Sequence, residues 1–429
     1  MAVLTSLAVV FGAMLLVVGI VRLVMTPFAL VFDARERRDH RRSPHGLGYF
    51  ERPPWVTVVV PAYQEAVVIE NCVRSILRTS YPHLDVVCVD DGSSDDTYAR
   101  MLRLAAEHPQ VTALRQENAG KGAALNTGIA AARGEVLLLV DADGLFGPDT
   151  VSELLRGFRD ERIGAVCGND RPVNLDRVQT KLLALISHVG TGLMRRAMDV
   201  LRCLPVVSGN VGAFRREVLA ATGPLRTDTL GEDLELTWRV YEAGYRVAFA
   251  PRALVHAESP STLRGLWRQR VRWARGLVQA TDLHRGMIGN PRYGAFGLYL
   301  VWSTLTQLVV PFVQVLFLVL LVVLVLVDGE GWLPASFWAW VVFLGLPLSV
   351  GLLLLAVGLD REPRDLRLLW TLPLWPLYSA MMSVVVLDAV RLELRGAENR
   401  WNKLERTGTV SVEGLVDPPD GEEPPRSSP

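Results

Sequence analysis

Two acidic pairs carry the first chemical signal in the sequence. Asp90 and Asp91 come directly after an apolar run, and Asp141 and Asp143 follow the apolar residues 136–140. Alternate residues of an extended stretch point the same way, so Asp141 and Asp143 can face one cleft. Two carboxylates at this spacing suit Mg²⁺ or Mn²⁺, which accept few protein oxygens beside a diphosphate. The carboxylates of Asp90 and Asp91 can accept hydrogen bonds from a base or a ribose.

Three further features suit the transfer of a group from a phosphate. Lys121 stands within Gly-Lys-Gly just before an expected helix, so its ammonium and the helix N-terminus can neutralise phosphate charge. Asp233, in Gly-Glu-Asp, precedes an amphipathic stretch and can act as a general base toward an acceptor hydroxyl. The segment 261–283 is rich in Arg and Trp and contains QRVRW at residues 269–273.

Each of these motifs also has a purely structural explanation. The acidic pairs can form turns and cap helices, and Asp233 can cap the helix that follows it. Lys121 can be a surface lysine beside a glycine. The segment 261–283 can be an amphipathic helix whose arginines meet lipid headgroups. The functional interpretation therefore depends on whether the fold brings the motifs together.

The elements that must position these residues alternate between strand and helix. β-branched runs predict strands at residues 56–60, 85–89, 111–114, 136–140 and 163–167, and amphipathic segments predict helices near 65–78, 97–107 and 123–132. This alternation predicts an α/β fold with a largely parallel sheet covered by helices on both faces. Ligands of such sheets bind beyond the carboxyl ends of the strands, where both acidic pairs stand.

The composition indicates a membrane protein. Half of the 429 residues are hydrophobic, and the mean hydropathy is positive, at +0.25. Residues 2–20 carry no charge and are long enough to cross a hydrocarbon core of ~30 Å. Arginines follow this run instead of preceding it, which predicts an uncleaved anchor with its N-terminus outside and a cytoplasmic middle domain. Lys+Arg and Asp+Glu both number 45, so no nucleic-acid partner is expected.

The C-terminal part contains further stretches of membrane-spanning length, at residues 294–327, 332–359 and 366–390. Three full crossings would place the basic residues after Val390 outside, against the positive-inside tendency. Either the last segment is kinked or re-entrant near Pro373 and Pro376, or the first contains an interfacial helix. The four cysteines show no metal-ligand spacing and are interpreted as reduced, mostly buried thiols of a cytosolic domain.

Six motifs in the same order resemble the processive family 2 glycosyltransferases, which include poly-N-acetylglucosamine, chitin-oligosaccharide, hyaluronan and cellulose synthases. They are VVVPAYQE at 58–65, VDDGSSDDT at 89–97, NAGKGAALNTG at 118–128, DAD at 141–143, GED at 231–233 and QRVRW at 269–273. The resemblance implies an α/β, GT-A type nucleotide-sugar-binding domain with a mostly parallel sheet, flanked by transmembrane α-helices.

The resemblance also implies a role for each motif residue. Asp233 would be the catalytic base, and Asp143 would bind the metal, Mg²⁺ or Mn²⁺. The residues implied to bind the nucleotide-sugar are Pro61, Tyr63, Glu65, Asp90, Asp91, Lys121 and Asp141. Those implied to bind the acceptor and the pyrophosphate are Ser208, Gln269, Arg272 and Trp273.

The implied activity is that of a membrane-bound inverting hexosyltransferase that polymerises sugar from a UDP-sugar into a β-linked polysaccharide. The layout favours UDP-N-acetylglucosamine as donor, with the polymer passing through the plasma membrane. A first alternative is transfer of one sugar to a lipid acceptor. A second is a catalytically inactive nucleotide-sugar-binding scaffold or a transporter. The expected partners are the donor, the polysaccharide or lipid acceptor and membrane lipids, and the sequence names no export protein.

The expected division of the chain follows from these motifs and runs of composition. It comprises an N-terminal transmembrane anchor (1–32), a basic cytoplasmic linker (33–54), a GT-A glycosyltransferase domain (55–258), an amphipathic interface region with the QxxRW motif (259–293), a C-terminal transmembrane region of about three spans (294–390) and a basic, then disordered tail (391–429).

Overall fold

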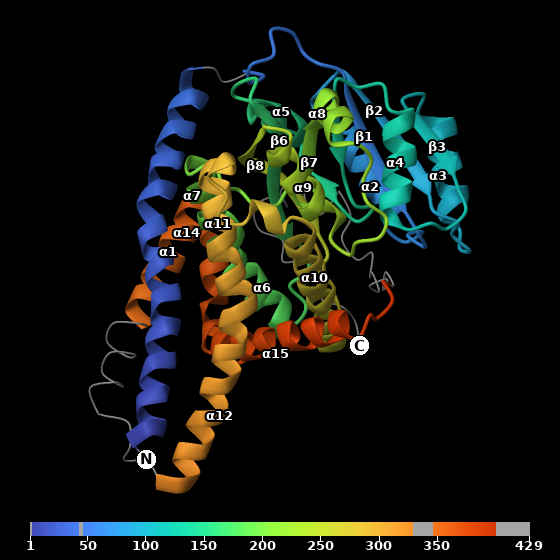
Figure 1. Ribbon diagram of the computed structural model, residues 1–429. Coiled ribbons are helices and arrows are strands. Elements are labelled where there is room, and N and C mark those ends of the chain that lie inside the picture. Colours follow the sequence, from blue (N-terminus) through green and yellow to red (C-terminus); the bar gives the residue numbers. More distant parts are fainter. Residues whose placement is uncertain (1, 43–45, 329–345, 400–429) are drawn as a thin grey trace.

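The computed structural model describes residues 2–42, 46–328 and 346–399 (Figure 1). Its centre is an eight-stranded sheet in the order β3-β2-β1-β4-β7-β6-β8-β5. The strands are β1 (Val56–Ala62), β2 (Leu84–Asp90), β3 (Val111–Arg115), β4 (Val136–Leu139), β5 (Leu145–Phe146), β6 (Ile163–Pro172), β7 (Gly212–Arg215) and β8 (Arg246–Ala257). Strands β1 to β4 run parallel to one another, and β6 is parallel to β8. Strand β7 is antiparallel to both β4 and β6, and β5 is antiparallel to β8.

Helices cover both faces of this sheet. They are α2 (Ile69–Leu77), α3 (Thr97–Glu107), α4 (Lys121–Ala131), α5 (Thr150–Arg156), α6 (Val178–Ser187), α7 (Met194–Val200), α8 (Arg216–Thr222) and α9 (Glu232–Glu242), with the π-helix η1 (His188–Leu193) between α6 and α7. Val58 and Val60 of β1 pack with α2 and α3, whereas Val59 packs with α4. A strand buried on both faces is continuously hydrophobic, as β1 is.

The predicted α/β fold is confirmed, and the five predicted strands are present with ends shifted by a few residues. Strands β5, β7 and β8 are additional. Strand β5 has two residues and β7 has four, so neither is long enough to show a period. Strand β8 contains Pro251 and two arginines, and its pairing with β6 is irregular. Proline is confined to edges and irregular places in a sheet, so sequence pattern argues against this strand.

Helix α1 (Ala2–Arg42) is continuous and passes through residue 32, where the sequence predicted the anchor to end. Its second half packs against the α/β domain, because Ala29 and Phe32 are buried there and α1 contacts α7. The anchor and the domain are therefore joined by packing as well as by the chain.

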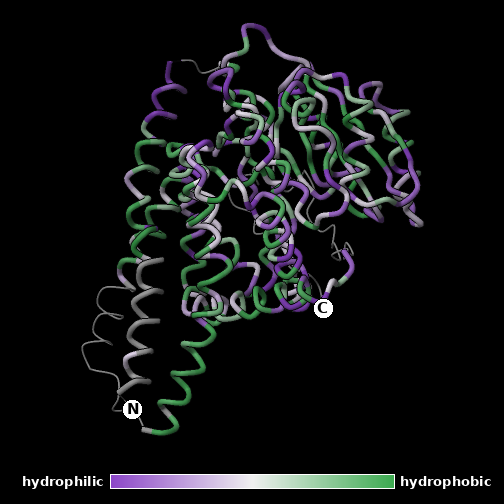
Figure 2. Tube along the Cα trace, in the orientation of Figure 1, coloured by the Kyte–Doolittle hydropathy of each residue, from purple (hydrophilic) through white to green (hydrophobic). Residues whose placement is uncertain are grey.

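The helices after β8 lie beside and below the sheet in Figure 1. They are α10 (Leu263–Leu283), η2 (Arg285–Met287), η3 (Pro291–Tyr293), α11 (Gly294–Thr304), η4 (Leu305–Val309), α12 (Val310–Asp328), α14 (Leu346–Asp360), η7 (Pro363–Leu374) and α15 (Trp375–Leu394). Helix α12 runs beside the lower part of α1, whereas α15 runs crosswise to both, below α10. Figure 2 shows that α12 is hydrophobic over its lower length and that the end of α1 near Arg42 is hydrophilic.

Two helical stretches in the described residues are long and apolar enough to cross a membrane, Pro291–Leu324 and Pro363–Leu394. A shorter apolar helix covers Pro347–Asp360. The predicted span at 332–359 lies partly outside the described residues, and the tail from residue 400 lies wholly outside them. The predicted span at 366–390 is divided, because the 3₁₀ helix η7 changes to α15 at Trp375, between Pro373 and Pro376.

A buried ionic cluster joins α14 to the α/β domain. The Asp360 carboxylate lies 2.5 Å from Arg171 on β6, 2.6 Å from Arg196 on α7 and 2.8 Å from Nδ1 of His188 on η1. The Asp360 side chain is fully buried. Removing one partner from such a cluster leaves uncompensated buried charge, so the C-terminal helices and the domain are held in a defined relation.

Candidate functional site

Asp91 organises the loop between β3 and α4. One carboxylate oxygen accepts hydrogen bonds from the backbone N–H of Ala119 (2.9 Å) and the side-chain amide of Gln116 (2.8 Å), and the other from the N–H of Gly120 (2.8 Å). Only 3% of Asp91 is exposed. The carboxylate thus orients the loop that presents Lys121.

Asp90 is buried beneath the same loop. Its carboxylate is 3.2 Å from the Arg115 guanidinium and 3.3 Å from the backbone N–H of Ser93, which donates to it. Both carboxylates, predicted to bind the nucleotide-sugar, are therefore engaged within the protein. Their contact with a base stays a prediction.

Lys121 begins α4 and lies between two carboxylates that come from other elements. Its ammonium is 2.7 Å from Oδ1 of Asp141, at the end of β4, and 3.0 Å from Oε1 of Glu232, at the start of α9. Burial by itself lowers the pKa of Lys121, but the two carboxylates outweigh burial and raise it. The lysine is therefore charged and forms the cationic centre of an acidic cluster.

Asp233 belongs to the same acidic cluster around Lys121 and follows Glu232 in the chain. Its Oδ2 accepts a hydrogen bond from the backbone N–H of Gly209 (3.1 Å), and its Oδ1 accepts one from Leu234 (2.8 Å). Burial and the neighbouring Glu232 charge raise the pKa of Asp233, and Lys121 partly offsets them. Burial also raises the pKa of Glu232, but Lys121 and Arg272 outweigh burial and lower it.

The pKa of Asp233 is thus raised and that of Glu232 is lowered, so the two adjacent carboxylates differ in proton affinity. Glu232 pairs with Lys121 and lies in the field of Arg272, whereas Asp233 has the raised pKa of the two. This is the arrangement from which acid and base assignments are made in active sites. Asp233 as the general base stays a prediction.

Gly209 marks the point where these side chains converge. A Cβ atom at this position would lie 2.8 Å from Nζ of Lys121, 3.5 Å from Oδ2 of Asp233 and 3.8 Å from Oδ2 of Asp141. Ser208, Gly209, Lys121, Glu232 and Asp233 line a small pocket here. Glycine leaves open the space that any other residue would fill.

The Asp-Ala-Asp segment forms the turn between β4 and β5. The Gly144 N–H donates to the Asp141 carbonyl (3.0 Å), and β5 follows at once. The Asp141 side chain is 28% exposed, whereas Asp143 is buried. Two carboxylates fit a divalent cation whose other ligands are diphosphate oxygens and water. Asp143 as the metal ligand stays a prediction.

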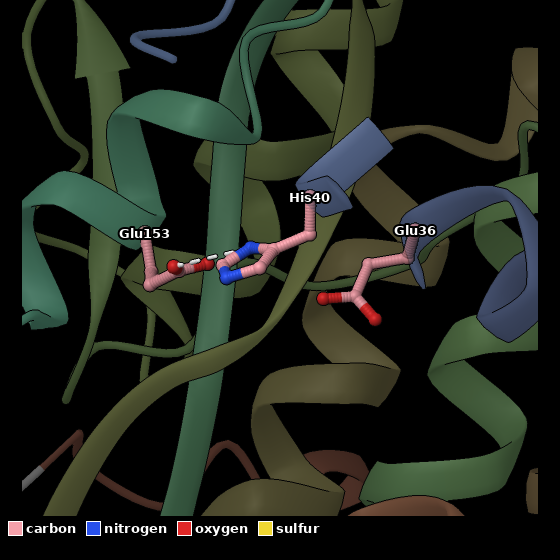
Figure 3. A group of neighbouring side chains, drawn as sticks. All are labelled: Glu36, His40 and Glu153. Carbon is pink, nitrogen blue, oxygen red and sulfur yellow. Dashed lines mark ion pairs between the residues drawn. The ribbon is translucent and has the colours of Figure 1, made fainter. Parts of the chain in front are cut away.

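A different group of potential metal ligands, Glu36, His40 and Glu153, joins α1 to α5 (Figure 3). Arg252 lies 2.5 Å from Glu36, and Arg156 lies 3.6 Å from Glu153. Burial and these arginines lower the pKa of His40. The surrounding positive charge opposes a bound cation, so this group is interpreted as an attachment of α1 to the domain.

The first motif places its residues beside the Asp91 loop. Pro61 pairs with Val89 in the sheet, and Tyr63 follows the end of β1. The buried Glu65 donates its backbone N–H to Oγ1 of Thr97 (2.8 Å), which joins this segment to the start of α3. The binding roles of Pro61, Tyr63 and Glu65 stay predictions.

The QRVRW motif lies on α10, where Gln269, Arg272 and Trp273 share one face. Trp273 is 48% exposed, and the Arg272 charge acts on Glu232. The helix approaches the GED segment backbone to backbone, because a Cβ atom on Gly276 would lie 2.9 Å from Cα of Gly231. This close approach brings the motif to the acidic cluster.

Sequence reasoning identified Lys121, Asp141 and Asp233 but assigned no role to Glu232 or Gly276. Glu232 stands beside Asp233 in the chain, yet adjacent helical residues point in different directions, and only the fold shows which one meets Lys121. The four cysteines are unpaired and buried, as predicted, and burial holds the pKa of Cys72 well above its usual value.

Comparison with known proteins found a matching family model and similar proteins. A family model described as Glycosyltransferase like family 2 matches residues 53–276, more than half of the chain. A poly-β-1,6-N-acetyl-D-glucosamine synthase of Staphylococcus aureus (strain COL) is 29% identical over 247 residues, which are 57% of this chain and 60% of that relative. The corresponding synthase of Staphylococcus epidermidis is 29% identical over 222 residues, or 52% of this chain and 54% of the relative.

A solved structure is similar over most of the chain. It is a mannosyltransferase of Pyrobaculum calidifontis in complex with GDP-Man and Mn²⁺, with a TM-score of 0.61 and 24% identity. The match covers 92% of this chain and all of that one. At this identity the likeness shows the fold, which is GT-A-like.

Proposed function

The chain belongs to glycosyltransferase family 2, and on that premise we propose that it is a membrane-bound inverting enzyme that polymerises sugar from a UDP-sugar into a β-linked polysaccharide. UDP-N-acetylglucosamine is the proposed donor, by similarity to relatives named as synthases of its polymer. The observation that carries the proposal is the convergence of Lys121, Asp141, Glu232 and Asp233 around Gly209.

The proposed reaction is a single displacement at the anomeric carbon. Asp233 accepts the proton of the acceptor hydroxyl as the new bond forms, and its raised pKa suits it to this task. Lys121 and Arg272 face the charge that develops on the departing diphosphate. Because the acceptor attacks from the face opposite the leaving group, the anomeric centre inverts.

A divalent cation, Mg²⁺ or Mn²⁺, would be held by Asp143 with Asp141 nearby, and when bound it supplies charge neutralisation at the diphosphate. Trp273 is half exposed at the acceptor side, where an indole face can stack on a sugar ring. Gln269 and Ser208 are proposed to contact the acceptor beside it.

The membrane arrangement is proposed from the helices. Helices α1 and α12 would cross the membrane, together with the span expected from the sequence at 332–359, which lies partly outside the described residues. Helix α15 would lie along the cytoplasmic surface. Helix α15 runs crosswise to α12 and packs against α10, while its Leu377 and Leu394 side chains are 70% and 84% exposed. This arrangement keeps the basic residues after Val390 cytoplasmic and agrees with the positive-inside tendency. The domain boundaries expected from the sequence are proposed unchanged, except that the helix of the N-terminal anchor continues through Arg42.

The experiment that tests the function uses the purified full chain reconstituted in lipid with Mg²⁺ or Mn²⁺. It is incubated with a panel of radiolabelled UDP-sugars and GDP-Man, and the products are separated by size and by glycosidase sensitivity. A polymer ladder from one donor would establish the synthase and its sugar. A single-sugar product that extracts into organic solvent would replace the polymerase with a lipid glycosyltransferase. Absence of transfer from every donor would contradict the proposal.

A further inference from the structure

Arg22 is the one charged residue in the sequence between residues 2 and 32. It lies on α1, directly after the uncharged run of residues 2–21. Charged side chains within apolar membrane segments are costly, and they mark functional sites by default. The position of Arg22 therefore requires a partner that compensates its charge.

Arg22 begins a row of cationic and aromatic side chains that crosses three helices. Its guanidinium lies 5.9 Å from the ring centroid of Trp375 on α15, and that ring lies 5.7 Å from Tyr378. Tyr378 forms a side-chain hydrogen bond with Arg270 of α10, whose guanidinium lies 4.2 Å from the ring centroid of Trp273. The row thus connects α1 to the proposed acceptor platform.

The positive charge of this row is not balanced. Among the residues that the structure describes, no carboxylate forms an ion pair with Arg22 or Arg270, and Nε of Arg270 has no hydrogen-bond partner. Asp170 is near enough to act on Arg270, but it already pairs with Arg195 at 2.8 Å. Burial lowers the pKa of Arg270, and Tyr378 and Asp170 only partly offset this effect.

Two ligands suit aromatic rings at a membrane surface, a sugar chain and a lipid headgroup. A neutral sugar chain would stack on the rings but leave both guanidinium charges uncompensated. A phosphate group would compensate them, because arginine binds phosphate through paired, charge-assisted hydrogen bonds. The charge of the row therefore favours a phosphate, and its place on α1 and α15 favours one carried by a lipid.

We propose that this row binds anionic membrane lipids, with lipid phosphate groups at the guanidinium groups of Arg22 and Arg270 that form its two ends. The proposal rests on the membrane arrangement given above for α1 and α15. It does not depend on the identity of the donor or on processivity, so it can fail while the glycosyltransferase activity stands.

The test measures lipid binding to the delipidated full chain in detergent by native mass spectrometry. Phosphatidylglycerol is titrated against phosphatidylcholine, and inorganic phosphate is added as a competitor. The wild-type protein is expected to retain phosphatidylglycerol in preference. Arg22→Gln and Arg270→Gln are each expected to weaken its binding roughly tenfold, and Arg22→Lys less than that. The matched control is Arg38→Gln, which removes the same charge from an exposed position on α1.

Binding of UDP, measured on each variant, reports on folding independently of the lipid site. Equal binding of the two lipids to the wild-type protein would overturn the proposal, whether or not a variant folds. Unchanged phosphatidylglycerol binding in folded Arg22→Gln protein would overturn it as well. Displacement of the lipid by inorganic phosphate at equal concentration would identify a free-anion site and overturn the assignment to a lipid.

Discussion

The ammonium of Lys121 lies 2.7 Å from the carboxylate of Asp141, although the two residues belong to different helix and strand units. Both were predicted to bind the nucleotide-sugar. In the described structure they form an ion pair with each other, and Oε1 of Glu232 lies 3.0 Å from the same ammonium group. A diphosphate that reaches Lys121 must therefore share the lysine with these carboxylates, so donor affinity depends on the balance of charge among them.

Replacing Lys121 by Gln should weaken UDP-sugar binding by about ten- to a hundredfold, because one full charge facing the diphosphate is lost. The change also removes the cation that lowers the pKa of Asp233, so the acidic limb of the kcat profile should move to higher pH. Calorimetric titration and a pH–rate profile measure the two effects. Lys181→Gln is the matched control, since Lys181 lies on α6 over Trp370. Unchanged donor affinity in Lys121→Gln would remove Lys121 from the site.

Asp233→Asn should reduce transfer by several orders of magnitude while UDP-sugar binding persists. The amide cannot accept the acceptor proton, but it keeps the size of the side chain. Product formation and donor binding are measured on the same preparation, with Asp228→Asn as an exposed control in the preceding loop. Turnover near the wild-type rate in Asp233→Asn would exclude it as the base.

Glu232→Gln should shift the acidic limb of the kcat profile to lower pH. The Glu232 charge raises the pKa of Asp233, so its removal lowers that pKa. A general base works when deprotonated, so activity then persists to more acidic conditions. A shift toward higher pH would show that Glu232 acts on Asp233 mainly through Lys121 rather than directly.

Asp143→Ala should weaken the metal-dependent part of nucleotide binding. Titration of UDP with and without Mn²⁺ separates that part from metal-independent binding, and it needs no turnover. Asp149→Ala removes an exposed carboxylate from the segment that follows β5 and should leave the titration unchanged. If Asp143→Ala keeps the full Mn²⁺ dependence, the cation is held elsewhere.

Gly276→Ala should lower kcat and the thermal unfolding midpoint together. The added methyl group would lie 2.9 Å from Cα of Gly231, so α10 and the GED segment must separate. Overpacking of this kind costs about 1–3 kcal/mol. Gly286→Ala is the control, because a Cβ atom there has no neighbour within 4 Å. A Gly276→Ala protein with unchanged activity would show that the close approach of the two glycines is not needed for catalysis.

The sequence was sufficient for features that depend on local pattern. Apolar runs of strand length predicted β1 to β4, and their alternation with helices predicted the parallel part of the sheet. Because parallel strands end at one edge, the order of strands and acidic residues along the chain was enough to place Asp91 and Asp141 at a common site. The six motifs predicted the family that the comparison confirmed.

Only the tertiary structure decided how distant segments meet. Strand β7 enters the sheet antiparallel between β4 and β6, and no local pattern specifies that pairing. The partner of Lys121, the approach of Gly276 to Gly231 and the crosswise position of α15 arise from contacts between residues far apart in the chain. The pKa values of the site residues also depend on the tertiary structure, because burial and neighbouring charge determine them. The sequence thus determined the chemical groups and their elements, and the packing of those elements decided which groups act on each other.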